Sequence, residues 1–152
     1  MDFILDNQQE LIKKTAREFA NDILRPGVII ERDEKSLFPK NEIIQMGELG
    51  FMGMMVPEKF GGSGLDTLSY CLALEEISKV DASVGVIMSV NNSLVCNLLY
   101  KYGNEHQKNT FLPKLASGKS LGSFSLSEPQ SGSDASNMKT FARRESSDFV
   151  IN

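Results

Sequence analysis

The residues best suited to chemistry in this 152-residue chain lie near its carboxyl end, in the segment Phe124-Ser-Leu-Ser-Glu-Pro-Gln-Ser-Gly-Ser-Asp134. A run of β-favouring residues there leads into a turn of small and polar ones. Gly132 permits close approach to the backbone, and three hydroxyls can bond to carbonyl, amide or phosphate groups, those of Ser127, Ser131 and Ser133. Such a loop suits a polar heterocycle or a diphosphate. Residue chemistry alone favours the alternative, a surface turn whose side chains cap their own backbone.

Three other features carry weaker indications of chemistry. Glu128 and Asp134 could pair as a general acid and base, but carboxylates in a turn are usually solvated. The glycines of segment 61–64 are not followed by Lys-Ser or Lys-Thr, so they do not form a phosphate-binding loop. His106 is the only histidine and lies in the first turn of a predicted helix, where we expect it to be exposed. We therefore predict neither a catalytic triad nor a metal site.

Polar residues inside predicted helices call for partners. Glu75 and Glu76 are most simply a helix face that meets solvent or Lys79. Asn91 and Asn92 lie with neighbouring serines in an apolar stretch, where unpaired amides cost free energy. These amides either bond to neighbouring helices or border a cavity, and packing is the favoured reading.

Composition limits the function classes. The chain is 41% hydrophobic and 24% charged with a net charge of -4, so it has no basic excess for binding nucleic acid. Its first residues lack the features of a signal or transit peptide, which predicts a cytoplasmic protein. The most apolar region, 84–99, is interrupted by polar residues and is expected to be a buried helix, with no membrane span. Cys71 and Cys96 are expected to be reduced thiols in the core.

The elements that would position these residues are mostly helices. Capping-box spacing at Asp6 and Gln9, glycine stops and apolar periodicity predict five helical segments, 6–25, 39–50, 66–79, 81–103 and 104–118. The third and fourth should form the centre of a bundle. The glycine-containing segment 51–64 is predicted to be a flexible loop.

After Gly118 the pattern changes to short β-favouring runs at 124–126, 138–143 and 149–151, with a hairpin turn at 145–148. Such a small sheet would have uncovered edges, so the chain is expected to be part of a longer protein. The predicted domains are an all-helical domain, 1–119, and the start of a β-domain, 120–152.

Several motifs, in order along the chain, resemble the acyl-CoA dehydrogenase family. Ser127-Glu-Pro-Gln-Ser-Gly-Ser-Asp134 is similar to the family's amino-terminal signature, with Gln130 where many members have glycine. Pro57-Glu-Lys-Phe-Gly-Gly62 is similar to its Pro-Glu-x-x-Gly-Gly loop. Further similar segments are Leu74-Glu-Glu-Ile-Ser-Lys79, Tyr102-Gly-Asn-Glu-His-Gln-Lys108 and Leu112-Pro-Lys-Leu-Ala-Ser-Gly118. Gly85-Val-Ile-Met-Ser-Val-Asn-Asn-Ser-Leu94 looks most like short-chain, butyryl-type members.

This resemblance implies a mainly α fold, in which the family's amino-terminal helical domain is followed by the first strands of a middle β-barrel domain that binds FAD. Transferred to this chain, Phe124, Leu126 and Ser127 would lie along the flavin. Gly132 and Ser133 would contact FAD, with Ser133 also near the CoA part of the substrate. The helix that contains Asn91 and Asn92 would border the acyl pocket.

The implied reaction is the α,β-dehydrogenation of a short-chain acyl-CoA, in which a carboxylate removes the α-proton and the β-hydrogen passes as hydride to flavin. The reduced flavin would be reoxidised by an electron-transferring flavoprotein, and family members usually assemble as tetramers. The family's base lies far toward the carboxyl end, so no residue of this chain can be assigned that role and this part alone should be inactive. Two alternatives stay open, a non-enzymatic helical interaction module and a flavoenzyme resembling the acyl-CoA oxidases.

Overall fold

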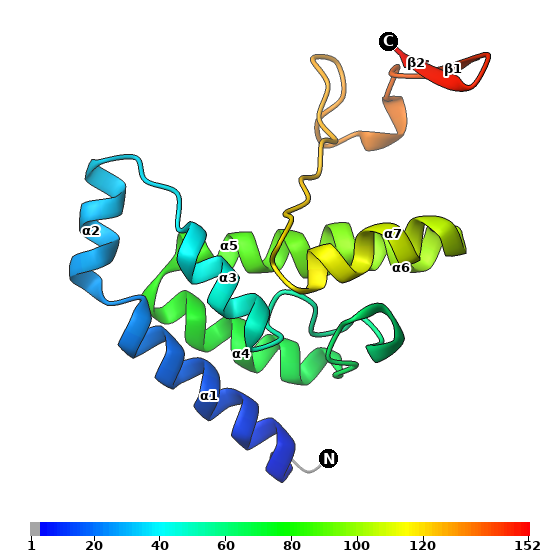
Figure 1. Ribbon diagram of the computed structural model, residues 1–152. Coiled ribbons are helices and arrows are strands. Elements are labelled where there is room, and N and C mark those ends of the chain that lie inside the picture. Colours follow the sequence, from blue (N-terminus) through cyan, green and yellow to red (C-terminus); the bar gives the residue numbers. More distant parts are fainter. Residues whose placement is uncertain (1–3) are drawn as a thin grey trace.

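Most of the chain folds into a body of helices from which a β-hairpin projects (Figure 1). The computed structural model describes residues 4–152. The α-helices in this range are α1 (Asn7–Ile23), α2 (Pro26–Glu34), α3 (Lys40–Glu48), α4 (Thr67–Val80), α5 (Ala82–Ser89), α6 (Asn97–Tyr102) and α7 (Glu105–Ala116). A π-helix, Val90–Cys96, joins α5 to α6, and short 3-10 helices span Glu58–Phe60 and Ala135–Asn137. The strands are β1 (Ala142–Glu145) and β2 (Asp148–Ile151).

The helices begin where side-chain oxygens can satisfy their free first-turn amides. Asp6 accepts from the Gln9 backbone N–H at 2.8 Å and completes the predicted capping box of α1. Asp66 and Asp81 cap α4 and α5 in the same way. Asn104 forms a second capping box at the start of α7. The predicted starts of these four helices are therefore confirmed.

Helix α2 was not predicted from the sequence. Pro26 directly follows the first predicted helix, 6–25, and is the first residue of α2, where a missing N–H costs nothing. None of the residues of α2 is buried. Arg32 attaches the helix to the body through ion pairs to Asp81 at 2.6 Å and Glu42 at 3.0 Å. These contacts come from residues far apart in sequence, so local periodicity gave no indication of them.

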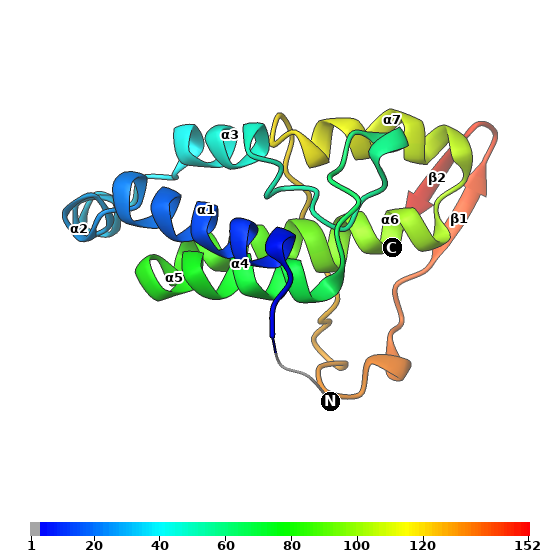
Figure 2. The same ribbon diagram turned by 90° about the horizontal axis from the view of Figure 1, so that it is seen from below.

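The main core lies where α1 packs against α4, with α3 and α5 beside them (Figure 2). Segment 51–64 also contributes to this core, which corrects its prediction as a flexible loop. Phe51, Met52 and Met54 are buried in this core, whereas Val56 and Phe60 are buried in a second cluster with Leu112 and Leu115 of α7. The glycines and Pro57 favour turns, but the apolar residues between them fill the space between helices. This loop is therefore held in place by packing.

The predicted fourth helix, 81–103, is continuous but contains the π-helix that sequence periodicity did not indicate. In the part of the chain that the structure describes, Ala82–Tyr102 is the one helix with the length and apolar composition to cross a membrane, with a mean hydropathy of 1.4 over its most apolar window. Asn91 and Asn92 are buried in the helical body and bond to it, but only 33% of that window is buried and Val86 is 62% exposed. The prediction of a buried helix therefore holds for one face of this segment.

The two cysteines differ in their surroundings. Both are free thiols, as predicted. Cys96 is buried with only 1% of its surface exposed, whereas Cys71 is exposed. The expectation that both lie in the core is therefore wrong for Cys71, because the buried stripe of α4 is formed by other residues of that helix.

The carboxyl-terminal segment forms the antiparallel hairpin β1–β2, with Ala142 opposite Ile151 and Glu145 opposite Asp148. Ser146 lies in the turn with a φ of 56°. The predicted hairpin is confirmed, but its first strand covers 142–145 and not 138–143, and its turn is confined to 146–147. The run at 124–126 is not a strand, because no described residue pairs with its backbone. It is part of a linker, residues 119–127, that leads away from the helical body (Figure 1).

Candidate functional site

The five residues predicted to contact FAD all lie between α7 and β1, on the segment that leaves the helical body. Phe124 and Leu126 are 42% and 40% exposed, which is high for large apolar side chains. Ser127, Gly132 and Ser133 are exposed as well. The structure thus places all five on one accessible segment and leaves their side chains available to another group.

The signature loop, residues 128–140, follows the linker and folds back on itself. Glu128 and Ser131 form an isolated antiparallel bridge, with N···O distances of 2.9 and 3.0 Å, around a tip at Pro129 and Gln130. Ser131 is buried and its hydroxyl donates to the backbone carbonyl of Asp134 at 2.7 Å. Ser131 is therefore a structural residue of the loop, as the surface-turn reading expected.

Glu128 closes this loop at its base. Its carboxylate accepts the backbone N–H of Lys139 at 2.7 Å and that of Thr140 at 3.0 Å, and the Gln130 amide donates to it as well. The hydrogen bonds, that from Lys139 first, lower the pKa of Glu128 from 4.5 to about 2. A carboxylate so strongly held in its ionised form is poorly suited to act as a general acid. Its role is to close the loop that carries Gly132 and Ser133.

The glycine and serines of the loop differ in what they contact. A Cβ added at Gly132 would meet nothing within 4 Å, so packing within the described chain does not require glycine there. The hydroxyls of Ser127 and Ser133 make no hydrogen bond to another described residue. Such groups can donate to an external ligand without first breaking an internal bond.

The two asparagines of the π-helix have partners, which confirms the packing interpretation. Asn92 donates to the carbonyls of Phe51 at 2.8 Å and Met88 at 3.0 Å, and accepts the Met54 N–H at 2.8 Å. Asn91 donates to the carbonyls of Met52 and Leu115. Together they attach the loop after α3 to the centre of the helical body.

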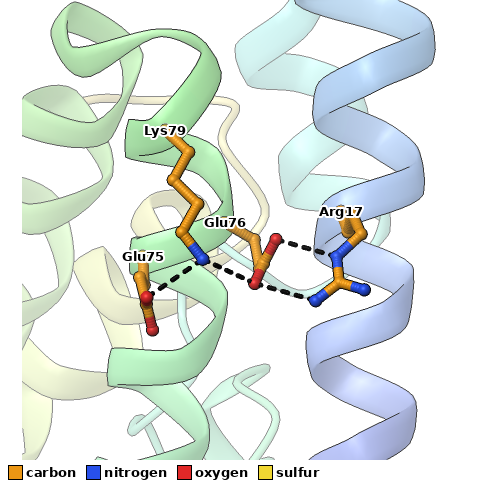
Figure 3. Close-up of polar contacts among 4 residues, drawn as sticks. All are labelled: Arg17, Glu75, Glu76 and Lys79. Atoms are coloured by element: carbon orange, nitrogen blue, oxygen red, sulfur yellow. Dashed lines mark hydrogen bonds and ion pairs between the residues drawn. The ribbon is translucent and has the colours of Figure 1, made fainter.

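A cluster of charged residues joins α1 to α4 (Figure 3). Arg17 donates to both carboxylate oxygens of Glu76, at 3.0 and 3.1 Å, and Lys79 contacts Glu75 and Glu76 at 3.0 Å each. Glu76 is only 4% exposed. The hydrogen bond from Arg17 is the main reason that the pKa of Glu76 falls from 4.5 to about 2. The predicted contact with Lys79 is therefore confirmed for both glutamates. Glu75 also meets solvent, whereas Glu76 is buried against Arg17 and joins two helices.

The remaining groups that the sequence raised are metal-ligating side chains and His106. No group of three His, Cys, Asp or Glu side chains in residues 4–152 is arranged to hold a metal ion. His106 is exposed in the first turn of α7, as predicted. The linker and loop, 119–140, form the candidate site because they carry all five predicted FAD contacts.

Sequence reasoning missed two features of this site. The sequence indicated Glu128 only as a possible acid or base, whereas its carboxylate closes the loop by accepting the backbone N–H groups of Lys139 and Thr140. Its position at the start of the turn was the only local signal for this role. Gly122 was not singled out, yet its backbone N–H lies 3.4 Å from the Asn91 side-chain oxygen. A glycine just before the β-favouring run was the only local indication of this close contact.

The comparisons with known proteins identify the family of this chain. Residues 6–119 match the family model of the acyl-CoA dehydrogenase N-terminal domain. The chain is 44% identical to the short-chain specific acyl-CoA dehydrogenase of Rattus norvegicus, over 97% of this chain and 36% of the rat protein. This chain belongs to the acyl-CoA dehydrogenase family. It spans little more than a third of the length of that relative.

Solved structures share the fold over nearly the whole chain. A chain in a structure of the electron transferring flavoprotein of Acidaminococcus fermentans has a TM-score of 0.93 and 44% identity, and the match covers 100% of this chain and 40% of that one. Butyryl-CoA dehydrogenase from Megasphaera elsdenii has a TM-score of 0.87 and 42% identity over 96% of this chain and 39% of its own. A glutaryl-CoA dehydrogenase from Mycobacterium smegmatis, solved in complex with FADH2, has a TM-score of 0.89 and 37% identity over 97% and 38%.

Proposed function

We propose that this chain is the amino-terminal part of an FAD-dependent dehydrogenase that converts a short-chain acyl-CoA to the trans-2-enoyl-CoA, in β-oxidation or related acyl-CoA metabolism. The observation that carries the proposal is the accessible signature loop beside a helical domain whose relatives include short-chain acyl-CoA and butyryl-CoA dehydrogenases. The domain boundary at 119/120 is part of this proposal.

The residues present fit FAD. The exposed faces of Phe124 and Leu126 can lie against an isoalloxazine ring, because burying apolar surface there would remove it from water. The hydroxyls of Ser127 and Ser133 can donate hydrogen bonds, and the open space at Gly132 admits a group close to the backbone. The related glutaryl-CoA dehydrogenase was solved with the reduced form of this cofactor.

In the proposed reaction, FAD supplies the acceptor for the β-hydrogen, and the α-proton goes to a carboxylate base. This chain contributes alignment, because the loop fixed by Glu128 and the apolar segment before it would hold the flavin in place. Ser133 would also contact the CoA part of the substrate. The proposed electron acceptor is an electron-transferring flavoprotein, and the proposed assembly is a homotetramer.

The test is to express the complete protein from its reading frame and to add butyryl-CoA without oxygen. We expect a yellow protein whose flavin absorbance is bleached by the substrate and restored by an electron-transferring flavoprotein. An acyl-CoA without α-hydrogens is the matched control, since it can bind but cannot be dehydrogenated. A colourless protein, or a flavin that no acyl-CoA bleaches, would refute the proposal, and peroxide formed in air would favour an oxidase.

One substitution tests the site itself. Ser127→Ala in the complete protein should weaken FAD binding, because it removes one hydrogen bond worth about 0.5–1.5 kcal/mol. Ser136→Ala is a matched control, because Ser136 bonds to Asp134 within the loop and is not expected to reach the cofactor. Equal FAD dissociation constants for Ser127→Ala and the unaltered protein would remove Ser127 from the site.

A further inference from the structure

The linker that carries the candidate flavin residues leaves α7 and passes directly over the π-helix. π-Turns within α-helices are rare and often occur at functional sites. Here the π-helix, Val90–Cys96, holds two adjacent buried asparagines with different sets of partners. Only one of the two asparagines contacts the linker.

Asn92 bonds only within the helical body. Its three partners are backbone groups of Phe51, Met54 and Met88, which belong to α5 and to the loop after α3. Its side chain has no bond to the linker. Asn92 therefore stabilises the helical body alone.

Asn91 connects the helical body to the linker. Its amide donates to the carbonyl of Met52 at 2.8 Å and to that of Leu115, near the end of α7, at 3.1 Å. Its oxygen faces the backbone N–H of Gly122 at 3.4 Å. The side chain of Asn91 thus contacts segment 51–64, the last turn of α7 and the linker. Fixing these three together sets the direction in which the chain leaves the helical body.

The shape of the same contact requires glycine at position 122. A Cβ built on Gly122 would lie 2.3 Å from Cγ1 of Val95 and 2.9 Å from its Cγ2. Val95 lies on the π-helix, one turn from Asn91. The linker is therefore seated against the π-helix both by a hydrogen bond and by an approach too close for any side chain. The two observations are independent and place the same residue on the same surface.

We propose that Asn91, Val95 and Gly122 position the flavin-binding segment by seating the linker on the π-helix. Phe124 follows Gly122 by two residues, which is about 7 Å along an extended chain. A shift of the linker at Gly122 is therefore transmitted to Phe124 and Leu126. This inference rests on the proposed function, because it holds that the contact of Gly122 with Asn91 and Val95 places Phe124 and Leu126 against FAD.

The test uses the complete flavoprotein and a rescue. Gly122→Ala should raise the dissociation constant of FAD about tenfold, alter the visible circular dichroism of the bound flavin and speed amide exchange in residues 119–127. Val95→Ala, added to Gly122→Ala, should bring all three back toward the unaltered protein, because it removes the methyl groups that the new Cβ would strike. Gly27→Ala is the matched control, since a Cβ there meets nothing within 4 Å.

The asparagines supply a second comparison. Asn91→Ala and Asn92→Ala each remove buried hydrogen bonds, so both should lower the stability of the helical body. Only Asn91→Ala should speed amide exchange at the linker and weaken FAD binding. Equal effects of the two variants on FAD, or a Gly122→Ala defect that Val95→Ala does not relieve, would overturn the inference. If the unaltered protein binds no FAD, the proposed function fails instead. Amide exchange in residues 119–127 then still tests whether Asn91 and Val95 hold the linker at Gly122.

Discussion

Glu76 offers a direct measurement of what the charged cluster between α1 and α4 contributes. Its carboxylate is 4% exposed and is held by Arg17 and Lys79, so the pKa is lower in the folded protein than in the unfolded chain. The fall from 4.5 to about 2 corresponds to at most about 3 kcal/mol of stability. Arg17 and Lys79 are half exposed, and screening by water reduces the expected contribution to about 1–2 kcal/mol.

The perturbation is Glu76→Gln, which keeps the shape of the side chain and removes its charge. Because the folded pKa is depressed, this contribution is fully present above about pH 4.5 and is lost as the pH falls toward about 2. Urea unfolding near neutral pH, followed by far-ultraviolet circular dichroism, should show a loss of about 1–2 kcal/mol. The difference between the variant and the unaltered protein should shrink as the pH is lowered through this range.

Glu75→Gln is the matched control, because Glu75 is the adjacent residue, contacts the same Lys79 at 3.0 Å and is 56% exposed. Its loss should stay below about 0.5 kcal/mol. If the two variants lose the same stability, burial is not what makes Glu76 matter. If the loss at Glu76 is the same at all pH values, the ionised carboxylate is not its source.

Two further predictions concern buried groups. Asp81→Ala should lower the free energy of unfolding by about 2–3 kcal/mol, since it removes both the cap of α5 and an ion-pair partner of Arg32, whose side chain is 11% exposed. Asp81→Asn, which can keep the cap, should cost less, and equal losses in urea unfolding would rule out a separate contribution from the cap. Alkylation of the native protein, mapped by mass spectrometry, should modify exposed Cys71 and spare Cys96, because burial raises the pKa of the Cys96 thiol to about 12. A Cys96 peptide that is labelled before the protein unfolds would contradict this prediction.

The local features of the fold were predicted from the sequence because they depend on neighbouring residues. A capping box needs only Asp6 and Gln9, and the hairpin needs only two short runs and the turn between them. The family signature is likewise a contiguous string of residues. The helical domain, the hairpin and the family are therefore all encoded locally.

Features that depend on distant partners were not predicted from the sequence. The burial of Glu76 follows from Arg17 on another helix, and the attachment of α2 follows from Arg32 reaching Asp81. Segment 51–64 contains turn-forming residues, but its apolar side chains fill a space that exists only after the helices assemble. The roles of FAD, the acyl-CoA and the cell compartment remain predictions.

The sequence by itself determined where α1, α4, α5 and α7 start, that a hairpin follows the helices and which family the chain belongs to, because each is encoded in residues close together along the chain. Only the tertiary structure decided that Asn91 reaches both the end of α7 and Gly122, because a hydrogen bond across 31 residues depends on how the helices pack. It also decided that the run at 124–126 is not a strand here, since a strand needs a paired neighbour and the described chain provides none.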